Sequence, residues 1–402
     1  MKIKKIIVSL FVAGVMVSPL AHETDGYFAH GYGMKAKGMG GAGIALPQDS
    51  LAAATNPAGM VMVGDRIDLG IDWFKPTRGA ELTGMGPISG AYDGNGDSNF
   101  LIPELGYNKM LSADSSIGIS VFGNGGMNTK YKDLNTRTGG AIFGTGDLGV
   151  DFSQLFISPT YAMKLNADNA IGVSLNLAYQ MIRVEGLQNF GVINPGYDSS
   201  TGYGLRLGWT GKVSPSVTLG ATYQTKTKMG KFSKYSGLFA EQGGFDVPAN
   251  YGVGIAAKLS DTTTIAADIE QIQYSGVRSV ANSMVSPGAL GNSDGPGFGW
   301  RDMTVLKLGI SHQYDNGLVV RAGYNGGRQP IPDNETLFNV IAPGVIQDHL
   351  TLGATWTMPS KSELTVAYMH AFKKTVTGSG ATTGFNLNMY QDSLGIAYGW
   401  KL

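Results

Sequence analysis

The chain has 402 residues, no cysteine, and 30 basic and 30 acidic residues, so its formal net charge is zero. The balanced charge gives no reason to expect nucleic acid as a partner, and the absence of cysteine excludes disulfides and thiolate metal sites. Mean hydropathy is close to zero, as it is in many soluble proteins and in membrane barrels, whose polar lumen and loops offset their lipid-facing residues.

The first 21 residues are organised like an export signal. Lys2, Lys4 and Lys5 precede an apolar run over residues 6–17, and this run is too short to cross a bilayer as a helix. We expect cleavage after Ala21. Residues 1–21 are therefore predicted to be a signal peptide that directs the chain to the cell envelope.

Residues 22–65, which we call the hatch, lack the alternation of a strand and consist largely of glycine, alanine and other small residues. Asp49 or Ser50 could cap a short helical turn, and Pro57 ends such a turn because it restricts Asn56. A segment with so few large side chains cannot form a core of its own. We therefore expect the hatch to lie inside another structure.

From residue 66 onward, large apolar residues alternate with small or polar ones; near the C-terminus, for example, Leu394, Ile396 and Tyr398 alternate with glycine and alanine. Successive side chains of a strand point to opposite faces, so each such segment has one apolar face. Fourteen candidate strands follow this pattern, over residues 66–77, 99–108, 116–132, 149–165, 169–186, 202–213, 216–229, 247–259, 263–278, 299–314, 318–327, 348–357, 362–374 and 390–402.

The connections between these strands alternate in length. Every second connection is a short turn, such as residues 214–215 and 315–317, and the others are long and rich in glycine, asparagine, aspartate and proline. Short turns at one end, long loops at the other and an even strand count are typical of outer-membrane barrels. We predict an all-β fold: a transmembrane antiparallel β-barrel of fourteen strands over residues 66–402, plugged by the hatch. Both barrel termini are then periplasmic, and the protein is multi-pass in the cell outer membrane.

Charged residues within the strands fit a polar lumen. If the large apolar side chains face lipid, then Asp72, Glu104, Arg206 and Lys307 point inward. Charges of both signs suit a lumen that holds a plug through hydrogen bonds and ion pairs, whereas an apolar core would leave each of them in need of a partner.

The sequence contains no recognisable catalytic or metal-binding set. Its five histidines are accompanied by no carboxylate pair, metal-ligand spacing or nucleophile motif. The glycine-rich stretch from Gly31 to Gly43 lacks the Lys-Ser/Thr pair and the βαβ context of a phosphate loop. We therefore expect no enzymatic activity, no catalytic residue, no metal and no cofactor.

Two stretches depart from the regular pattern. The candidate strand over residues 116–132 is interrupted by Gly123, Asn124, Gly125 and Gly126. Glycine inside a strand marks a bulge, a bend or a close backbone approach. This interruption is therefore either a bend of the barrel or a gap in its wall.

The second stretch is the loop over residues 231–239, in which Phe232, Tyr235, Leu238 and Phe239 recur at helical spacing. Exposed apolar residues in such a loop either pack on a neighbouring loop or receive an apolar ligand. The residues by themselves leave both readings open.

These features together resemble the FadL-type outer-membrane transporters, the long-chain fatty acid and hydrocarbon transport proteins. The resemblance rests on Asn56-Pro57-Ala58, the strand pair over residues 100–131, the loop over residues 235–259 and the fourteen strands. It covers essentially the whole mature chain. One departure is Leu402, because an aromatic residue is usual at the last position.

The resemblance implies passive transport of hydrophobic molecules across the outer membrane. A ligand, a long-chain fatty acid or similar hydrocarbon, would be caught at the outer loops and released sideways after the hatch moves. The implied site residues are the hatch motif Asn56, Pro57 and Ala58, the lateral gap at Gly123, Asn124, Gly125 and Gly126, and the capture loop residues Phe232, Tyr235, Leu238 and Phe239. The implied partners are the hydrophobic small molecule and the lipid and lipopolysaccharide around a monomeric barrel.

We further hypothesise that Asn56 pairs with backbone groups of the gap at rest, because an asparagine side chain offers both donors and an acceptor. The alternatives are a general hydrophilic porin, against which the hatch argues, and a structural or adhesive barrel. The sequence does not distinguish fatty acids from alkanes or aromatic compounds. It also does not distinguish lateral exit from passage to the periplasm.

Overall fold

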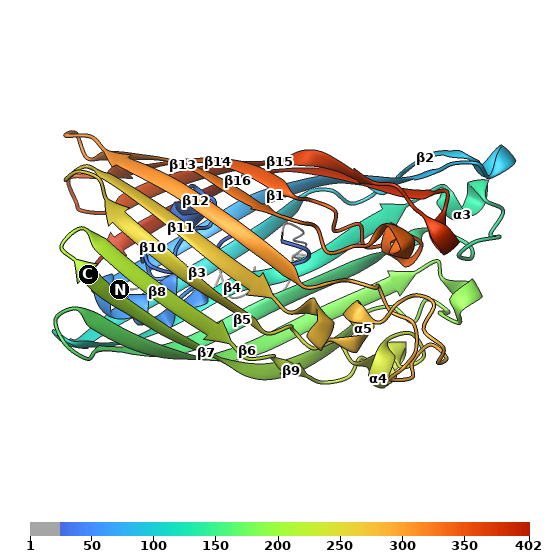
Figure 1. Cartoon of the computed structure of the whole chain (residues 1–402), viewed down its shortest axis with the longest axis horizontal. Helices are drawn as coiled ribbons and strands as arrows, with labels where there is room; N and C mark the ends of the chain where they lie inside the picture. Colours follow the sequence, from blue (N-terminus) through green and yellow to red (C-terminus); the bar gives the residue numbers. More distant parts are fainter. Residues whose placement is uncertain (1–24) are drawn as a thin grey trace, which may run out of the picture.

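The computed structural model describes residues 25–402, and its sixteen strands form one sheet that closes on itself (Figure 1). Neighbouring strands are antiparallel, and pairing of β16 with β1 closes the barrel. Fourteen strands form the wall, while β2 pairs only with β1 and β9 only with β7. The predicted fold class is confirmed. The predicted signal peptide and the start of the hatch lie outside the described residues.

The structure has these strand boundaries. The wall consists of β1 (Arg66–Leu82), β3 (Phe100–Ser112), β4 (Ser115–Tyr131), β5 (Leu148–Lys164), β6 (Asn169–Glu185), β7 (Asp198–Ser214), β8 (Val217–Gln224), β10 (Asn250–Lys258), β11 (Thr263–Ile272), β12 (Met303–Gln313), β13 (Leu318–Gly327), β14 (Asp348–Thr357), β15 (Glu363–Val376) and β16 (Phe385–Lys401). The two additional strands are β2 (Gly90–Asp93) and β9 (Lys228–Met229).

Helical segments are short. The α-helical turns are α2 (Met34–Lys37), α3 (Leu134–Arg137), α4 (Ala240–Gly243) and α5 (Arg278–Ala281). The 3₁₀ turns are η1 (Ala52–Ala54), η2 (Pro57–Met62), η3 (Gly86–Ile88), η4 (Gln188–Phe190), η5 (Ser233–Tyr235), η6 (Tyr274–Gly276), η7 (Asp333–Glu335), η8 (Phe338–Val340) and η9 (Gly380–Thr382). Within residues 25–402, no helix is long and apolar enough to cross a membrane.

Side-chain alternation divides the wall into an outer surface and a lumen. On β12, Leu306 and Leu308 are 39% and 41% exposed, whereas Val305 and Lys307, which alternate with them, are 0% and 5% exposed. The other charged residues predicted to point inward are also buried, namely Asp72, Glu104 and Arg206. Apolar side chains thus cover the outside of the barrel, and charges of both signs line its interior, as a membrane barrel requires.

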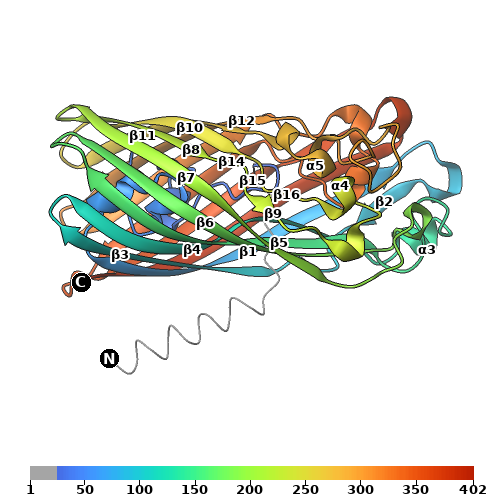
Figure 2. The same ribbon diagram turned by 90° about the horizontal axis from the view of Figure 1, so that it is seen from below.

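The two ends of the barrel differ (Figures 1 and 2). Short turns and the C-terminus lie at one end, which we call the short-turn end. The long loops lie at the other end with α3, α4 and α5, and we call it the long-loop end. Some strands run further into the loops than predicted, so only residues 377–384 remain between β15 and β16. In contrast, β11 ends at Ile272, and η6 and α5 replace its predicted continuation.

Most of the described part of the hatch lies inside the barrel near the short-turn end, and α2, η1 and η2 are its only regular turns among the described residues. Its small residues let its backbone approach the wall closely. A β-carbon on Gly38 would lie 2.9 Å from the α-carbon of Gly353 in β14, closer than β-carbons come in real structures. The glycine-rich composition of the hatch therefore follows from its fit inside a narrow lumen.

Candidate functional site

An apolar pocket, which we call the outer pocket, lies among the loops of the long-loop end. It is lined by Phe143, Leu187, Phe190, Leu238, Phe239, Ser279, Leu290, Pro296, Gly297, Phe298, Phe338 and Ile341. The hydroxyl of Ser279 already donates a 2.5 Å hydrogen bond to the carbonyl of Gly244. The pocket therefore offers a ligand almost no polar partner and suits an uncharged apolar molecule.

The outer pocket is narrow as it stands. Its cavity volume is about 40 Å³, whereas an apolar protein cavity that binds benzene has roughly 150 Å³. A ligand of even that size must displace side chains of the loops. Leu238, which is only partly buried, is one side chain that can move without opening the barrel itself.

The structure separates the four predicted capture residues into two pairs. Leu238 and Phe239 line the outer pocket. Phe232 and Tyr235 are 0% and 1% exposed and pack behind Phe239, with ring centroids at 6.3 and 6.0 Å. The hydroxyl of Tyr235 donates to the carbonyl of Gly196 at 2.7 Å. This pair supports the wall of the pocket and does not face its interior. The role of all four residues in capture stays a prediction.

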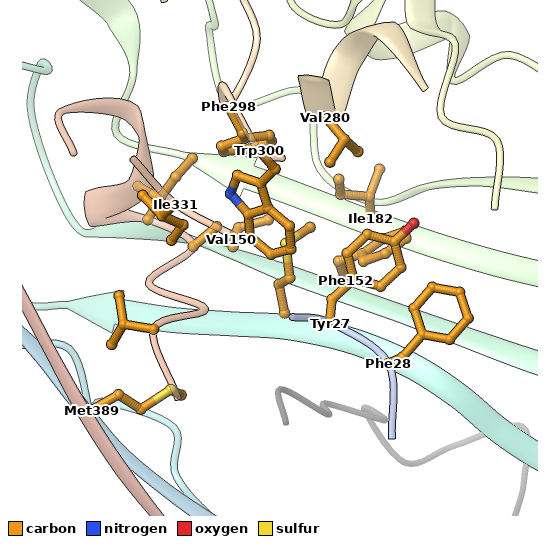
Figure 3. Close-up of a cluster of buried hydrophobic side chains, with 14 of the residues drawn as sticks. Tyr27, Phe28, Val150, Phe152, Ile182, Val280, Phe298, Trp300, Ile331 and Met389 are labelled. Carbon is orange, nitrogen blue, oxygen red and sulfur yellow. The ribbon is translucent and has the colours of Figure 1, made fainter. Parts of the chain in front are cut away.

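Aromatic rings in edge-on and tilted contact continue from the outer pocket into the barrel, and Figure 3 shows Tyr27, Phe152 and Trp300 among them. The ring of Phe239 lies 5.2 Å from that of Phe245, which lies 4.9 Å from Phe152. Phe152 in turn lies 5.9 Å from Tyr27, which also contacts Trp300 at 5.8 Å. The apolar contacts therefore run without a break from the loops to the first described residues of the hatch.

The hydrogen-bonded wall is interrupted on one side of this aromatic cluster. β3 pairs with β4 only from the short-turn end up to Leu105 and Val121. Above that pair, the only wall strand bonded to β3 is β1, and the only wall strand bonded to β4 is β5. Higher still, backbone hydrogen bonds join Lys130 to Gly94 and Gly96. The hydrogen-bonded sheet is therefore interrupted between β3 and β4, along the part of β4 that contains the predicted glycine-rich stretch. We call this interruption the lateral gap.

Residues 25–32 of the hatch, which we call the arm, close the lateral gap from inside. The strand bulges between Gly123 and Gly125, and the arm bonds to this bulge. The amide of Ala29 donates to the carbonyl of Asn124 at 3.1 Å, and the amide of Gly126 donates to the carbonyl of Tyr27 at 3.0 Å. Backbone groups at the edge of the lateral gap are thus satisfied by the arm rather than by a neighbouring wall strand.

Asn56 does not lie at the lateral gap, so the hypothesis that it closes the gap is wrong. Its side-chain amide donates to the carbonyls of Ile44 at 2.7 Å and Trp209 at 3.0 Å, and its oxygen accepts from the amide of Ala58 at 3.1 Å. The first and last of these bonds are within the hatch, and the second reaches β7. Asn56, Pro57 and Ala58 therefore form a structural turn that fixes the hatch to the wall at β7.

Buried ion pairs anchor the rest of the hatch. Lys35 Nζ lies 2.6 Å from Glu363, and Lys37 Nζ lies 2.6 Å from Asp72, with all four side chains nearly inaccessible. Burial lowers the pKa of the Lys37 amine, but the carboxylates of Asp72 and Glu104 outweigh this effect and raise the pKa. Removing one partner of a buried pair costs about 3–5 kcal/mol. This part of the hatch is therefore held firmly.

The arm is held differently, by neutral hydrogen bonds and one weak ion pair. The hydroxyl of Tyr274 donates to the Asp25 carbonyl at 2.5 Å and accepts from the amide of Tyr27 at 3.1 Å. The Asp25 carboxyl accepts from Asn325 at 3.2 Å and lies 3.8 Å from Lys307. Burial raises the pKa of this carboxyl to about 7.

The arm is not among the site residues predicted from the sequence. Tyr27 and Phe28 are adjacent aromatic residues in a hatch that is rich in glycine and alanine, and this contrast was the available signal. The structure places both rings in the aromatic cluster and their backbone at the lateral gap.

A family model described as outer membrane protein transport protein (OMPP1/FadL/TodX) matches residues 23–399. A search of curated proteins found no match. Several solved structures are similar. The toluene transporter TodX of Pseudomonas putida has 18% sequence identity and a TM-score of 0.74, over 93% of this chain and 99% of that one.

Two further solved structures are also similar to this chain. A FadL homologue of Pseudomonas aeruginosa has 16% identity and a TM-score of 0.73, over 94% of this chain and 99% of that one. The toluene transporter TbuX of Ralstonia pickettii has 18% identity and a TM-score of 0.64, over 92% and 98%. At such low identity these similarities establish a shared fold.

Proposed function

This chain belongs to the OMPP1/FadL/TodX family of outer membrane transport proteins, and from that premise we propose that it carries small uncharged hydrocarbons passively into the outer membrane. The ligand enters the outer pocket, passes the aromatic cluster and leaves through the lateral gap when the arm moves. The observation that carries the proposal is the unbroken contact of aromatic rings from Phe239 to Tyr27, which ends where the arm is bonded to the interrupted edge of β4.

The lining of the outer pocket favours a neutral ligand over a fatty acid. It contains no charged side chain. A fatty acid would have to leave its carboxylate at the rim, where Lys231 and Arg278 already pair with Glu241 at 3.7 and 3.4 Å. Similar solved structures are described as toluene transporters, and an aromatic hydrocarbon matches the aromatic lining. Long-chain fatty acids remain the second candidate class.

Polar and charged residues further down the lumen favour lateral exit of the ligand over passage to the periplasm. At the level of the gap, Asn124 donates to Gln154 at 2.9 Å and Gln154 donates to Gln180 at 3.2 Å. Beyond this polar belt come buried charges such as Arg206 and Lys307, and then the anchored hatch. An apolar molecule gains nothing from such surroundings, whereas membrane lipid outside the gap solvates it well.

The proposal includes an orientation. Outer-membrane barrels keep short turns in the periplasm and long loops outside, so the long-loop end and its outer pocket face the medium, and both barrel termini are periplasmic. Because the arm carries no nucleotide site, its movement must come from differential binding of the ligand to the closed and open states. The barrel acts as a monomer without enzymatic activity.

Uptake by cells tests the proposal. Cells whose outer membrane contains the protein are compared with cells that lack it, at low external concentrations of radiolabelled toluene, a long-chain fatty acid and a hydrophilic sugar. We expect the protein to raise the rate of toluene uptake most and to leave sugar uptake unchanged.

Two results would decide against it. An equal rise in sugar uptake would mean an open aqueous lumen and favour a hydrophilic porin. Fatty acid uptake without toluene uptake would mean that the outer pocket takes long-chain fatty acids, the second candidate class. A double variant, Leu238→Ser with Phe239→Ser, should lose toluene uptake. Gly276→Ala, whose added β-carbon meets no atom within 4 Å, serves as the matched control.

A further inference from the structure

A second pocket, which we call the rim pocket, lies where β12 and β13 meet the loops of the long-loop end. It has a volume of about 440 Å³ and is lined by Arg301, Asp302 and Thr304, by residues 328–333 and by Val376. In contrast to the outer pocket, its lining includes two arginines and two aspartates, the second aspartate being Asp333.

The strand register places the rim pocket on the outside of the barrel. Val305 faces the lumen and pairs with Gly327, so the next positions, Thr304 and Arg328, face outward together. Both are exposed. The next residue on the same face of β12 is Leu306. Its side chain is 39% exposed and belongs to the apolar outer surface of the barrel.

The rim pocket therefore begins where the apolar band of the barrel ends. On β13 the last large outward residue is Tyr324, whose hydroxyl donates to Asp348 at 2.5 Å. A tyrosine with its ring toward apolar surface and its hydroxyl on a charged group is typical of a membrane–water interface. Groups just above this level meet the headgroups of the membrane leaflet.

The charged groups of the rim pocket are available to a ligand. Neither Arg301 nor Arg328 has an ion pair within 4 Å among residues 25–402, and both side chains are exposed. Asp302 accepts one hydrogen bond, from the amide of Ser275 at 2.8 Å. The carboxylate of Asp333 is exposed and forms no ion pair with any described residue.

The loop that carries Arg328 is preformed. Pro330 and Pro332 restrict its backbone. Between them, Ile331 is bonded to the side chain of Gln329 through both its amide, at 2.6 Å, and its carbonyl, at 2.8 Å. The amide of Arg301 donates to the carbonyl of Pro330 at 2.9 Å, which joins the two sides of the pocket. The charged groups thus sit on a rigid frame.

We propose that the rim pocket binds the phosphorylated sugar headgroup of an outer-leaflet glycolipid, the lipid A part of lipopolysaccharide. Arg301 and Arg328 bind the phosphate, because a guanidinium matches phosphate oxygens with two parallel donors. Asp302 and Asp333 accept hydrogen bonds from sugar hydroxyls. A bare phosphate would be repelled by these carboxylates, so the mixed charges favour a ligand that presents both groups. The inference rests on the proposed orientation, in which the long-loop end faces outside.

Binding to the purified full-length protein in detergent tests the proposal, with three probes: lipid A, dephosphorylated lipid A and inorganic phosphate. We expect a double variant, Arg301→Gln with Arg328→Gln, to lose roughly tenfold or more in affinity for lipid A. Lys228→Gln removes an exposed charge at the same end of the barrel, on β9, and should change the affinity by less than about twofold. Asp333→Asn should weaken lipid A binding.

Three results would overturn the inference: wild-type affinity in the double variant, equal binding of dephosphorylated lipid A, or inorganic phosphate bound as tightly as lipid A. Toluene uptake by the same variants separates this question from the proposed function. We expect normal uptake by the double variant. If wild-type protein fails to transport toluene but binds lipid A through these arginines, the transport proposal fails and the rim pocket stands.

Discussion

Replacing Gly125 with alanine should open the lateral gap. A β-carbon at this position would overlap the carbonyl oxygen of Tyr27, well inside the 3.0 Å that real β-carbons keep. The backbone of Gly125 is not in the left-handed region, so alanine fits the strand itself. The only partner that must give way is the arm. This reverses the simple expectation that filling a glycine-rich interruption blocks transport.

The size of the effect follows from the bonds that hold the arm at the bulge. Displacing it breaks the hydrogen bonds from Ala29 to Asn124 and from Gly126 to Tyr27. A hydrogen bond contributes about 0.5–1.5 kcal/mol net, so the docked arm loses about 1–3 kcal/mol. The equilibrium between closed and open gap then shifts by a factor of about 5 to 150.

The position of the arm can be measured directly because the chain has no cysteine. Ala29→Cys places a thiol on the arm at a position that is 5% exposed in the closed state. We expect Gly125→Ala to accelerate maleimide labelling of this thiol and toluene uptake together. Gly276→Ala should leave both rates unchanged. Labelling that stays slow in a folded Gly125→Ala variant, or fast labelling without faster uptake, would refute the reasoning.

Three further predictions concern the pocket and the hatch. Changing Leu238 or Phe239 singly to alanine should weaken hydrocarbon binding by at most about 1.5–3 kcal/mol, the value of burying one such side chain, as measured by ligand titration of intrinsic fluorescence. Lys37→Met leaves the carboxylate of Asp72 buried without its partner, so the barrel should lose about 3–5 kcal/mol of stability and unfold at lower temperature in a gel-shift assay. Burial raises the pKa of Asp25 from 3.8 to about 7, so docking of the arm is most favourable below pH 3.8 and weakens as pH rises through 7. Thiol labelling of Ala29→Cys should therefore rise more steeply with pH when Asp25 is present than when it is replaced by Asp25→Asn, with the two compared at each pH.

The barrel wall was predictable from the sequence. Alternation with a period of two is a local property of each strand, and one apolar face per strand is enough to imply a membrane barrel. The inward positions of Arg206 and Lys307 followed from the same alternation. The short strand β2 was not predicted, because its four residues carry no periodic pattern. The strand predicted over residues 216–229 ends at Gln224 in the structure, and its last two residues form the separate strand β9.

In the capture loop, the spacing of residues in the sequence did not determine how they pack. Spacing marked Phe232, Tyr235, Leu238 and Phe239 as one apolar set. Which of them face the outer pocket depends on the loops around them, which come from distant parts of the chain. Phe143, Phe298 and Phe338 complete the pocket, and nothing near these residues in the sequence relates them to one another.

Closure of the lateral gap was decided by tertiary structure alone. The sequence located the interruption at Gly123 to Gly126, because glycine is distinctive there, and suggested Asn56 as its partner because of its side chain. The groups that close the gap are instead backbone amides and carbonyls of Tyr27, Ala29, Asn124 and Gly126. Backbone groups are the same in nearly every residue, so their pairing across about a hundred positions leaves no mark in the sequence. Only the path of the hatch through the lumen brings them together.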